Sequence, residues 1–294
     1  MSYSRHIHGL LVVGLTSFCF TWNANAAIVL EEDFEGIDIS GGPANLTNSN
    51  SIFTSNVSGG TFQVINNNPP PLPTGGTNNF TGTQYLRYVD EAASPVLRAP
   101  VALSGGFVLS FDYFEPNETS GTQTALRVLL SNGVSGTSSG ANGVRAVELN
   151  LNVGNSVATG TITSIGTAAN STVNPFVSYN ANQLVHIDVV GNLAPGVAAY
   201  GGGASPFPSG TVAQFQYDLY VNGVLAIEAA GFRNPHASIT EFALVSISTT
   251  ASVQTAYIDN ISIDNILPIP EPGSFMLFCI GIAGCGIHRR RRNS

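Results

Sequence analysis

Three carboxylates near the start of the chain have a spacing suited to hydrolysis of a glycosidic bond. Glu31, Asp33 and Glu35 alternate along the segment "EEDFE", so a β-strand would place them on one face. Paired carboxyl groups at a sugar linkage can act as nucleophile and general acid. However, the only tryptophan is Trp22, close to the N-terminus, which leaves the rest of the chain without a tryptophan platform for a sugar ring. We therefore expect no catalysis here, and glycoside hydrolysis remains an alternative.

The other face of the same segment favours a cation site. Glu32 alternates with apolar residues, and near the other end of the chain Asp259 alternates with residues such as Ile261. A carboxylate buried among apolar side chains needs a compensating charge. If the two segments pair, a structural Ca²⁺ held by Glu32 or Asp33 together with Asp259 would supply it, with Asp112 as a weaker third ligand. The alternative is that these acids lie at strand ends in water.

The elements that would position these acids are all predicted to be β-strands. Apolar and polar residues alternate in short runs separated by Gly, Asn, Ser and Pro, and no sustained helical period occurs between the two terminal segments. Many short strands with glycine-rich turns are typical of a sandwich or a barrel. The predicted strands are 26–34, 84–89, 107–113, 125–130, 144–153, 184–190, 212–221, 239–249 and 255–263.

Turns and loops complete this pattern. Asn222-Gly223 between two apolar runs predicts a type I′ hairpin. Segments 66–81, 131–143 and 191–210 are rich in Pro, Gly, Ser or Ala and are predicted to be exposed loops. His186 and Asp188 would share one strand face, an arrangement more typical of an exposed polar pair than of a catalytic one. Four tyrosines are candidates for stacking on a sugar: Tyr85, Tyr88, Tyr200 and Tyr220.

Composition excludes several classes of function. The ten basic residues are all arginines, and five of them lie in the segment 27–267 with seventeen acids, which gives a net charge of −12 (5 − 17). A surface this acidic repels phosphate backbones, so nucleic-acid binding is excluded. The three cysteines all lie in the terminal segments, so segment 27–267 has no disulfide, thiol nucleophile or cysteine metal site.

The N-terminal segment has the pattern of a secretory signal peptide. Arg5 precedes an apolar run that ends at Phe20, and small residues lead to a cleavage site between Ala26 and Ala27. We therefore expect residues 1–26 to be removed by a signal peptidase and residues 27–267 to form a single exported domain.

The C-terminal segment, 268–294, has the pattern of a short membrane handle. Its apolar run from Ser274 to Ile287 would span roughly 21 Å as a helix, less than the roughly 30 Å of a hydrocarbon core. Arg289, Arg290, Arg291 and Arg292 would stay cytoplasmic and leave the acidic domain outside. Prolines at the start of the segment keep Pro270-Glu271-Pro272 extended beside the bilayer.

This tail resembles the PEP-CTERM sorting signal in the order of its three features: Pro270-Glu271-Pro272, a short apolar helix and the arginine cluster. The resemblance covers about 25 residues. It implies processing by an exosortase-type peptidase in a Gram-negative bacterium, after transient anchoring in the inner membrane. The destination it implies is the cell surface or the extracellular matrix.

The domain resembles concanavalin A-like and laminin-G-like jelly rolls. "DFEG" near the start, "LSFDYF" in an early strand, "YVNG" in a late hairpin and "YIDNISI" in the last strand carry this resemblance. It implies a two-sheet β-sandwich whose first and last strands are adjacent. Laminarinase-type glycosidases of this fold carry a Glu-x-Asp-x-Glu comb in mid-domain, whereas here the comb stands near the N-terminus.

These features predict a non-enzymatic surface or matrix protein with a structural or adhesive role in exopolysaccharide and biofilm. The first alternative is a lectin-like carbohydrate-binding module, because the fold alone does not select a function. The second is a laminarinase-like glycoside hydrolase that uses Glu31 and Glu35. The expected partners are a signal peptidase, an exosortase-type peptidase and exopolysaccharide, and no cofactor is expected apart from the calcium ion.

Overall fold

The computed structural model describes residues 27–38, 40, 44–46, 52–56, 61–66, 80, 83–90, 96–116, 125–134, 139–152, 159–165, 173–201, 207–246 and 254–265. Their regular structure consists of eighteen strands and a short 3-10 helix, η2 (Ser139–Val144). The predicted all-β fold is therefore confirmed.

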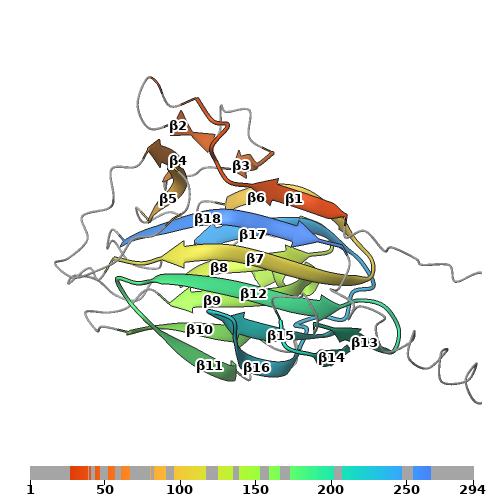
Figure 1. Ribbon diagram of the computed structural model, residues 1–294. Coiled ribbons are helices and arrows are strands. Elements are labelled where there is room, and N and C mark those ends of the chain that lie inside the picture. Colours follow the sequence, from red (N-terminus) through yellow and green to blue (C-terminus); the bar gives the residue numbers. More distant parts are fainter. Residues whose placement is uncertain are drawn as a thin grey trace, which may run out of the picture.

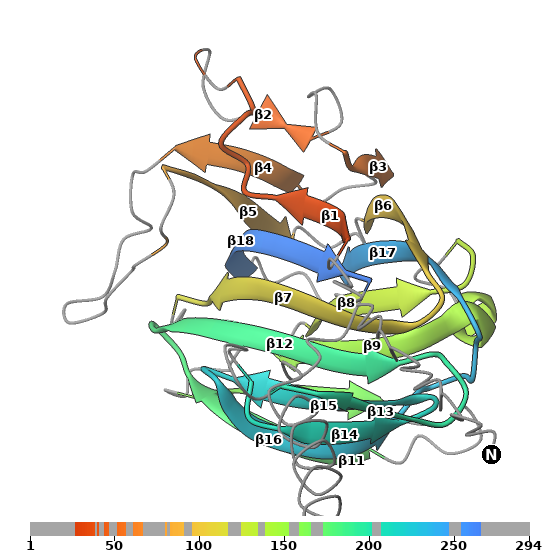
Figure 2. The same cartoon turned by 45° about the vertical axis from the view of Figure 1, so that its right-hand side comes forward.

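Sixteen of the strands form two antiparallel sheets that face each other as a jelly-roll-like sandwich (Figures 1 and 2). The larger sheet has the order β16 (Val224–Gly231), β15 (Gln216–Val221), β12 (Leu184–Asn192), β7 (Gly106–Phe114), β18 (Gln254–Asp264), β5 (Gln84–Asp90), β4 (Thr61–Asn66) and β2 (Ala44–Asn45), with β1 (Ile28–Glu32) also paired to β18. The smaller sheet has the order β11 (Val173–Asn180), β10 (Thr159–Ile165), β9 (Arg145–Asn152), β8 (Ala125–Ser131), β17 (Ile239–Ser246), β6 (Val96–Leu103) and β3 (Thr54–Asn56).

The main hydrophobic core fills the space between the two sheets. β7 shows why the sequence folds this way, since Phe107, Leu109, Phe111 and Tyr113 alternate along the strand and all lie in this core. Each is at most 1% exposed. The period-2 pattern thus assigned this strand and its inner face correctly.

One predicted strand is divided in two. Segment 212–221 contains the end of β14 (Gly210–Ala213), a turn in which Phe215 has a φ of 61°, and the whole of β15. β14 pairs with β13 (Val197–Tyr200), which lies inside the segment predicted to be the loop 191–210, so that prediction was wrong for these residues. This small third sheet rests on the larger one, where Val212 and Tyr200 pack with residues of β7, β12 and β15.

The hairpin prediction is confirmed. Asn222 and Gly223 have φ values of 52° and 74° between β15 and β16, the two positive values that a type I′ turn requires. Val221 and Val224 are register partners on either side of the turn.

The predicted adjacency of the first and last strands is also confirmed, because β1 pairs antiparallel with β18. β18 contains an irregularity that the sequence pattern did not indicate. Its register against β7 shifts between Asp259 and Ser262, and Asn260 has a φ of 51°. Such a bulge reverses the face on which later residues point.

A cluster of charged side chains lies within the smaller sheet. The Glu148 carboxylate is 1% exposed. It forms ion pairs with Arg145 and Arg127, each at 3.2 Å, and a third with Arg233. Burial and the neighbouring cations Arg145 and Arg233 lower the pKa of Arg127, although Glu148 raises it. One buried carboxylate therefore holds three guanidinium groups.

Three sequence-based expectations lie outside the described residues: the signal peptide 1–26, the segment 268–294 with its motif, and the Ala26 side of the cleavage site. Among the residues that are described, no helix is both long and apolar enough to cross a membrane.

Candidate functional site

The outer face of the larger sheet carries a row of polar side chains contributed by its central strands. Strand pairing places Asp112 of β7 opposite His186 of β12 on one side and opposite Asp259 of β18 on the other. One step along, Ser110 is the register partner of Asp188. Because register partners in antiparallel strands point to the same face, these groups converge.

His186 is held between two carboxylates. Its Nδ1 lies 2.6 Å from Asp112 Oδ1 and its Nε2 lies 3.0 Å from Asp188 Oδ1. Hydrogen bonds to Asp112 and then Asp188 raise the pKa of His186 to about 10, against the lowering effect of burial. The imidazole is therefore a cation at neutral pH, with both N–H groups donating, and it has no lone pair with which to act as a base.

The two carboxylates have further donors. Asn260 Nδ2 donates to Asp112 Oδ2 at 2.7 Å, and Ser110 Oγ donates to Asp188 Oδ1 at 2.6 Å. Asn260 and Ser110 thus hold the two carboxylates in place. Within this network the imidazole is the most exposed group, with 46% of the His186 side chain exposed. Both of its N–H groups are already engaged by Asp112 and Asp188, so the exposed part of the ring is its carbon edge and faces.

Asp259, also on this face, has one carboxylate oxygen without a hydrogen-bond donor among the described residues. It is fully buried, its Oδ1 accepts from the Asn260 backbone N–H at 2.8 Å, and its Oδ2 has no hydrogen-bond partner among the described residues. Burial raises the pKa of Asp259 to about 7, with Asp112 contributing repulsion and the Asn260 N–H opposing the shift.

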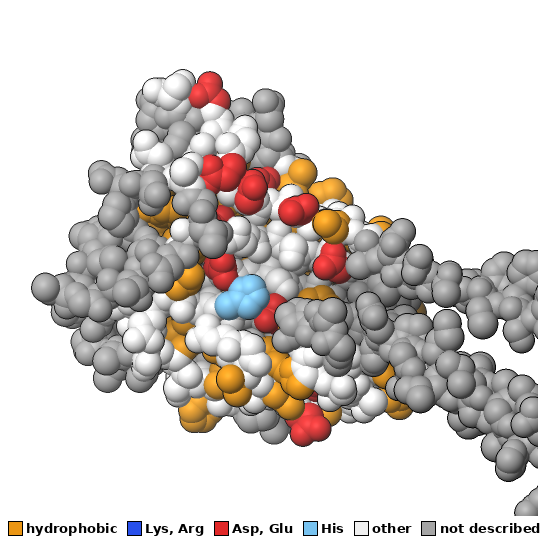
Figure 3. All heavy atoms as spheres, viewed as in Figure 1, with side chains coloured by type: hydrophobic (Ala, Val, Ile, Leu, Met, Phe, Trp, Pro, Cys, Tyr) orange, Lys and Arg blue, Asp and Glu red, His pale blue; other side chains and the backbone are white. Residues whose placement is uncertain are grey.

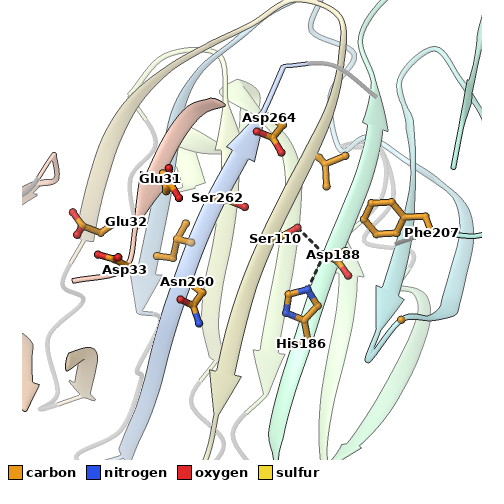
Figure 4. Close-up of a pocket in the computed structure, with 13 residues that line it drawn as sticks. Glu31, Glu32, Asp33, Ser110, His186, Asp188, Phe207, Asn260, Ser262 and Asp264 are labelled. Atoms are coloured by element: carbon orange, nitrogen blue, oxygen red, sulfur yellow. Dashed lines mark hydrogen bonds and ion pairs between the residues drawn. The ribbon is translucent and has the colours of Figure 1, made fainter. Parts of the chain in front are cut away.

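A cleft of about 500 Å³ opens on this face beside the network (Figure 4). In Figure 4, β1 and the end of β18 form one wall, and Phe207 lies across from them beyond His186 and Asp188. Figure 3 shows acidic side chains gathered around the histidine, with no Lys or Arg of the described residues visible from this side. The ionisable residues that line the cleft are Glu31, Glu32, Asp33, His186, Asp188 and Asp264.

The carboxylate comb is only half formed. Glu31 pairs in register with Ser262 and lines the cleft, as Asp33 does. β1 ends at Glu32, however, and Phe34 has a φ of 60°, so alternation does not continue to Glu35. The predicted strand 26–34 was therefore too long.

The carboxylate of Glu35 is hydrogen-bonded to residues at the start of β5. Its carboxylate accepts hydrogen bonds from the Thr83 hydroxyl at 2.5 Å, the Gln84 N–H at 2.7 Å and the Thr83 N–H. Burial raises the pKa of Glu35, but the hydrogen bonds from Thr83 and Gln84 outweigh it and lower the pKa overall. Glu35 is thus an ionised structural acceptor.

The residues proposed for calcium are arranged differently from the expectation. Because of the bulge at Asn260, Asp259 lies on the outer face while Ile261 and Ile263 point into the core, so the expected common face was wrong. Glu32 Oε1 accepts from the Phe34 N–H at 3.0 Å, and Asp33 Oδ1 accepts from the Glu35 N–H at 3.1 Å. Within the described residues, no three His, Cys, Asp or Glu side chains form a metal-binding group. Calcium stays a sequence-based prediction.

The tyrosines chosen as stacking platforms are unsuitable, because Tyr85, Tyr88, Tyr200 and Tyr220 are each at most 1% exposed. Tyr200 and Tyr220 share a hydrogen bond of 2.7 Å between their hydroxyl groups, and Tyr200 also binds Asp218. A sugar ring cannot reach faces that other side chains already cover.

Sequence reasoning found the pair His186 and Asp188 but missed Ser110 and Asn260. It also gave Asp112 only a minor role. Ser110 and Asp112 alternate with the core residues of β7, so their outer position was available from the pattern; their partners were not, because strand order cannot be obtained from periodicity.

Comparison with known proteins identifies the end of the chain. Residues 268–292 match the model of the PEP-CTERM protein-sorting motif. The chain carries a PEP-CTERM sorting signal. The match indicates an exported protein that is sorted by an exosortase-type peptidase, with membrane-anchored processing. No curated protein sequence matches the chain.

Several solved structures are similar to parts of this chain, at low TM-score and low sequence identity. The carbohydrate esterase vb_24B_21 from the Shiga toxin-encoding bacteriophage phi24B has a TM-score of 0.47 at 12% identity, over 78% of this chain and 100% of that one. The alginate lyase vAL-1 from Chlorella virus has a TM-score of 0.39 at 10% identity, over 65% and 88%. The binding domain of Paraclostridial Mosquitocidal Protein 1 has a TM-score of 0.40 at 12% identity, over 85% and 51%.

Proposed function

We propose that this chain is a cell-surface or extracellular-matrix protein of a Gram-negative bacterium with a non-enzymatic, structural or adhesive role in exopolysaccharide. The observation that carries the proposal is the PEP-CTERM signal at 268–292, which follows a β-sandwich. Sorting delivers the domain outward, and the domain then acts by what it binds.

The chemistry of the outer face supports a binding role. His186 stays protonated between Asp112 and Asp188, so it does not provide a general base near neutral pH. Glu35 is bound by Thr83 and Gln84, which removes one of the two carboxylates that a glycosidase would need.

A second candidate function, a lectin-like carbohydrate-binding module, is favoured by the cleft. Its carboxylates and its serine hydroxyls are the kinds of groups that hydrogen-bond sugar hydroxyls. Its acidic lining disfavours polysaccharides rich in uronate or sulfate and favours neutral or amino sugars.

One set of experiments with exopolysaccharide purified from the producing strain distinguishes the two proposed functions. The processed protein, recovered from the cell surface or the medium, is sedimented with this polymer as wild type and as the double variant Glu31→Gln/Asp33→Asn. Both changes lie on the cleft rim, and Glu228→Gln, an exposed acid outside this cleft, is the matched control. A lectin-like module requires that co-sedimentation falls in the double variant and persists in the control.

A structural role without sugar recognition requires instead that a strain lacking the protein forms a weaker matrix, and that both variants restore it equally. Release of new reducing ends from the polymer by the wild-type protein would contradict the non-enzymatic proposal. Recovery of the protein with its arginine cluster intact, in the cell envelope only, would contradict the sorting step.

A further inference from the structure

The first residue of the expected mature chain, Ala27, lies against Asn265, the residue that follows the last strand. The Asn265 N–H donates to the Ala27 carbonyl at 3.1 Å, and Ile28 is the register partner of Asp264. The seam between β1 and β18 therefore begins at the position where signal-peptide cleavage after Ala26 would create a new N-terminus.

Two acceptor atoms at this seam lack a donor. Asp264 Oδ1 and Asn265 Oδ1 are both shielded from solvent, and neither has a hydrogen-bond partner among the described residues. Figure 4 shows Asp264 at the end of β18. Leaving a buried acceptor unpaired is costly, and a carboxylate costs more than a neutral oxygen.

The surroundings of Asp264 disfavour its negative charge, and a cation nearby would stabilise it. Burial, and then the nearby Glu31 of β1, raise the pKa of Asp264. On its other side β7 presents Val108, the register partner of Asp264, which offers no charge. The five described arginines have partners elsewhere: three of them surround Glu148, Arg98 pairs with Glu241, and Arg87 donates to Gln63.

We propose that removal of the signal peptide creates the missing cation: the α-ammonium group of Ala27, which pairs with the Asp264 carboxylate and the side-chain oxygen of Asn265. An α-ammonium group brings three N–H donors and a positive charge, whereas the same nitrogen in the precursor is one neutral amide. The seam thus acts as a binding site for the chain's own processed terminus.

The pairing has a consequence for sorting. β18 ends at Asp264, four residues before Pro268, where the PEP-CTERM match begins. Removal of the signal peptide would therefore stabilise the end of β18, the strand that precedes the sorting signal in the chain. We expect this end of β18 to be more stable in the mature protein than in the precursor.

The composition provides a clean test. Because all ten basic residues are arginines, the α-amino group is the only primary amine of the mature chain, and an amine acetylating reagent followed by hydroxylamine modifies that group alone. Mass spectrometry of the processed protein first establishes that it begins at Ala27. Thermal unfolding is then compared for the free and acetylated forms of the wild type, of Asp264→Asn and of the control Glu228→Gln.

We expect acetylation to lower the Tm by about 2–4 °C in the wild type and the control, and by clearly less in Asp264→Asn. The pH dependence of the acetylation rate gives a second readout that remains available if Asp264→Asn does not fold. A paired ammonium has a pKa above the usual value of about 7.7–8.0, so its stabilisation is complete below that range and is lost as the pH rises through the raised pKa.

Three results would overturn the proposal. One is a mature N-terminus at a residue other than Ala27. Another is an equal Tm shift on acetylation in the wild type and in Asp264→Asn. The third is an ordinary pKa for the α-amino group of the folded wild type.

Discussion

Replacing Glu148 by Gln should be among the most destabilising conservative substitutions in the domain. Its carboxylate, 1% exposed, is the shared partner of Arg127, Arg145 and Arg233, whose side chains are 19%, 0% and 15% exposed. Glutamine has nearly the same shape, so the change removes a charge without opening a cavity. What remains is three guanidinium groups in close proximity with no anion among them.

The magnitude follows from the geometry. One ion pair at 3.2 Å contributes about 5 kcal/mol of attraction at an effective dielectric constant near 20, and desolvation offsets much of this. Breaking a buried pair by removing one partner typically costs about 3–5 kcal/mol. Arg145 lies in this regime, whereas Arg127 and Arg233 reach solvent and add less. We expect a loss of about 3–5 kcal/mol, or a fall in Tm of roughly 10 °C for a domain of this size.

The assay is chemical and thermal unfolding of the processed protein, with Glu241→Gln as the matched control. Glu241 is an acid of the same sheet whose ion pair with Arg98 is longer, at 3.6 Å. The side chains of Glu241 and Arg98 are 10% and 18% exposed, so loss of this pair should cost about 1 kcal/mol or less. If the two substitutions cost the same, the shared carboxylate does not hold the cluster together and the reasoning is refuted.

Four further predictions concern the outer face and the termini. Because partners raise the pKa of His186 to about 10, its stabilisation is complete below the ordinary value of about 6.5 and fades as the pH rises through about 10; the Tm gap between wild type and His186→Gln should close there. Because burial raises the pKa of Asp259 to about 7, this residue lowers the stability progressively as the pH rises from the ordinary value of about 3.9 to about 7, and Asp259→Asn should raise the Tm at pH 8 in metal-free buffer but not at pH 4. Calcium bound by Asp259 would reverse that sign, and excess chelator would lower the Tm; an unchanged melting curve would remove the calcium prediction. Deletion of Arg289–Arg292 should leave the protein cell-associated with its tail uncut, as fractionation and mass spectrometry would show.

The sequence was informative wherever one face of a strand is apolar. β7 alternates with a period of two and was assigned with its inner face, and the Asn222-Gly223 turn was identified from its dipeptide. β6 was missed because Pro100 interrupts its apolar run, and proline usually argues against a strand. β13 was missed because Val197–Tyr200 is short and lies in a segment rich in Gly and Ala.

The site was less predictable than the fold for two physical reasons. The contact between Asp112 and His186 depends on which strands are neighbours, and strand order is a property of the whole fold rather than of local pattern. The bulge at Asn260 depends on a single residue with a φ of 51°, and asparagine at that position gave no distinct signal. Strict alternation therefore placed Asp259 on the wrong face of β18.

That bulge also explains why polar chemistry gathers where it does. Had β18 continued without it, Asp259 and Ile261 would share a face, and either a carboxylate would enter the apolar core or an isoleucine would leave it. By reversing the face at Asn260, the chain keeps Ile261 and Ile263 in the core and puts Asp259 beside Asp112 on the outside. The same residue then donates its side-chain amide to Asp112, so one backbone irregularity both protects the core and holds the network that contains His186. The central strands thus hold the network in place, while Glu31 and Asp33 stay exposed at the rim of the adjoining cleft.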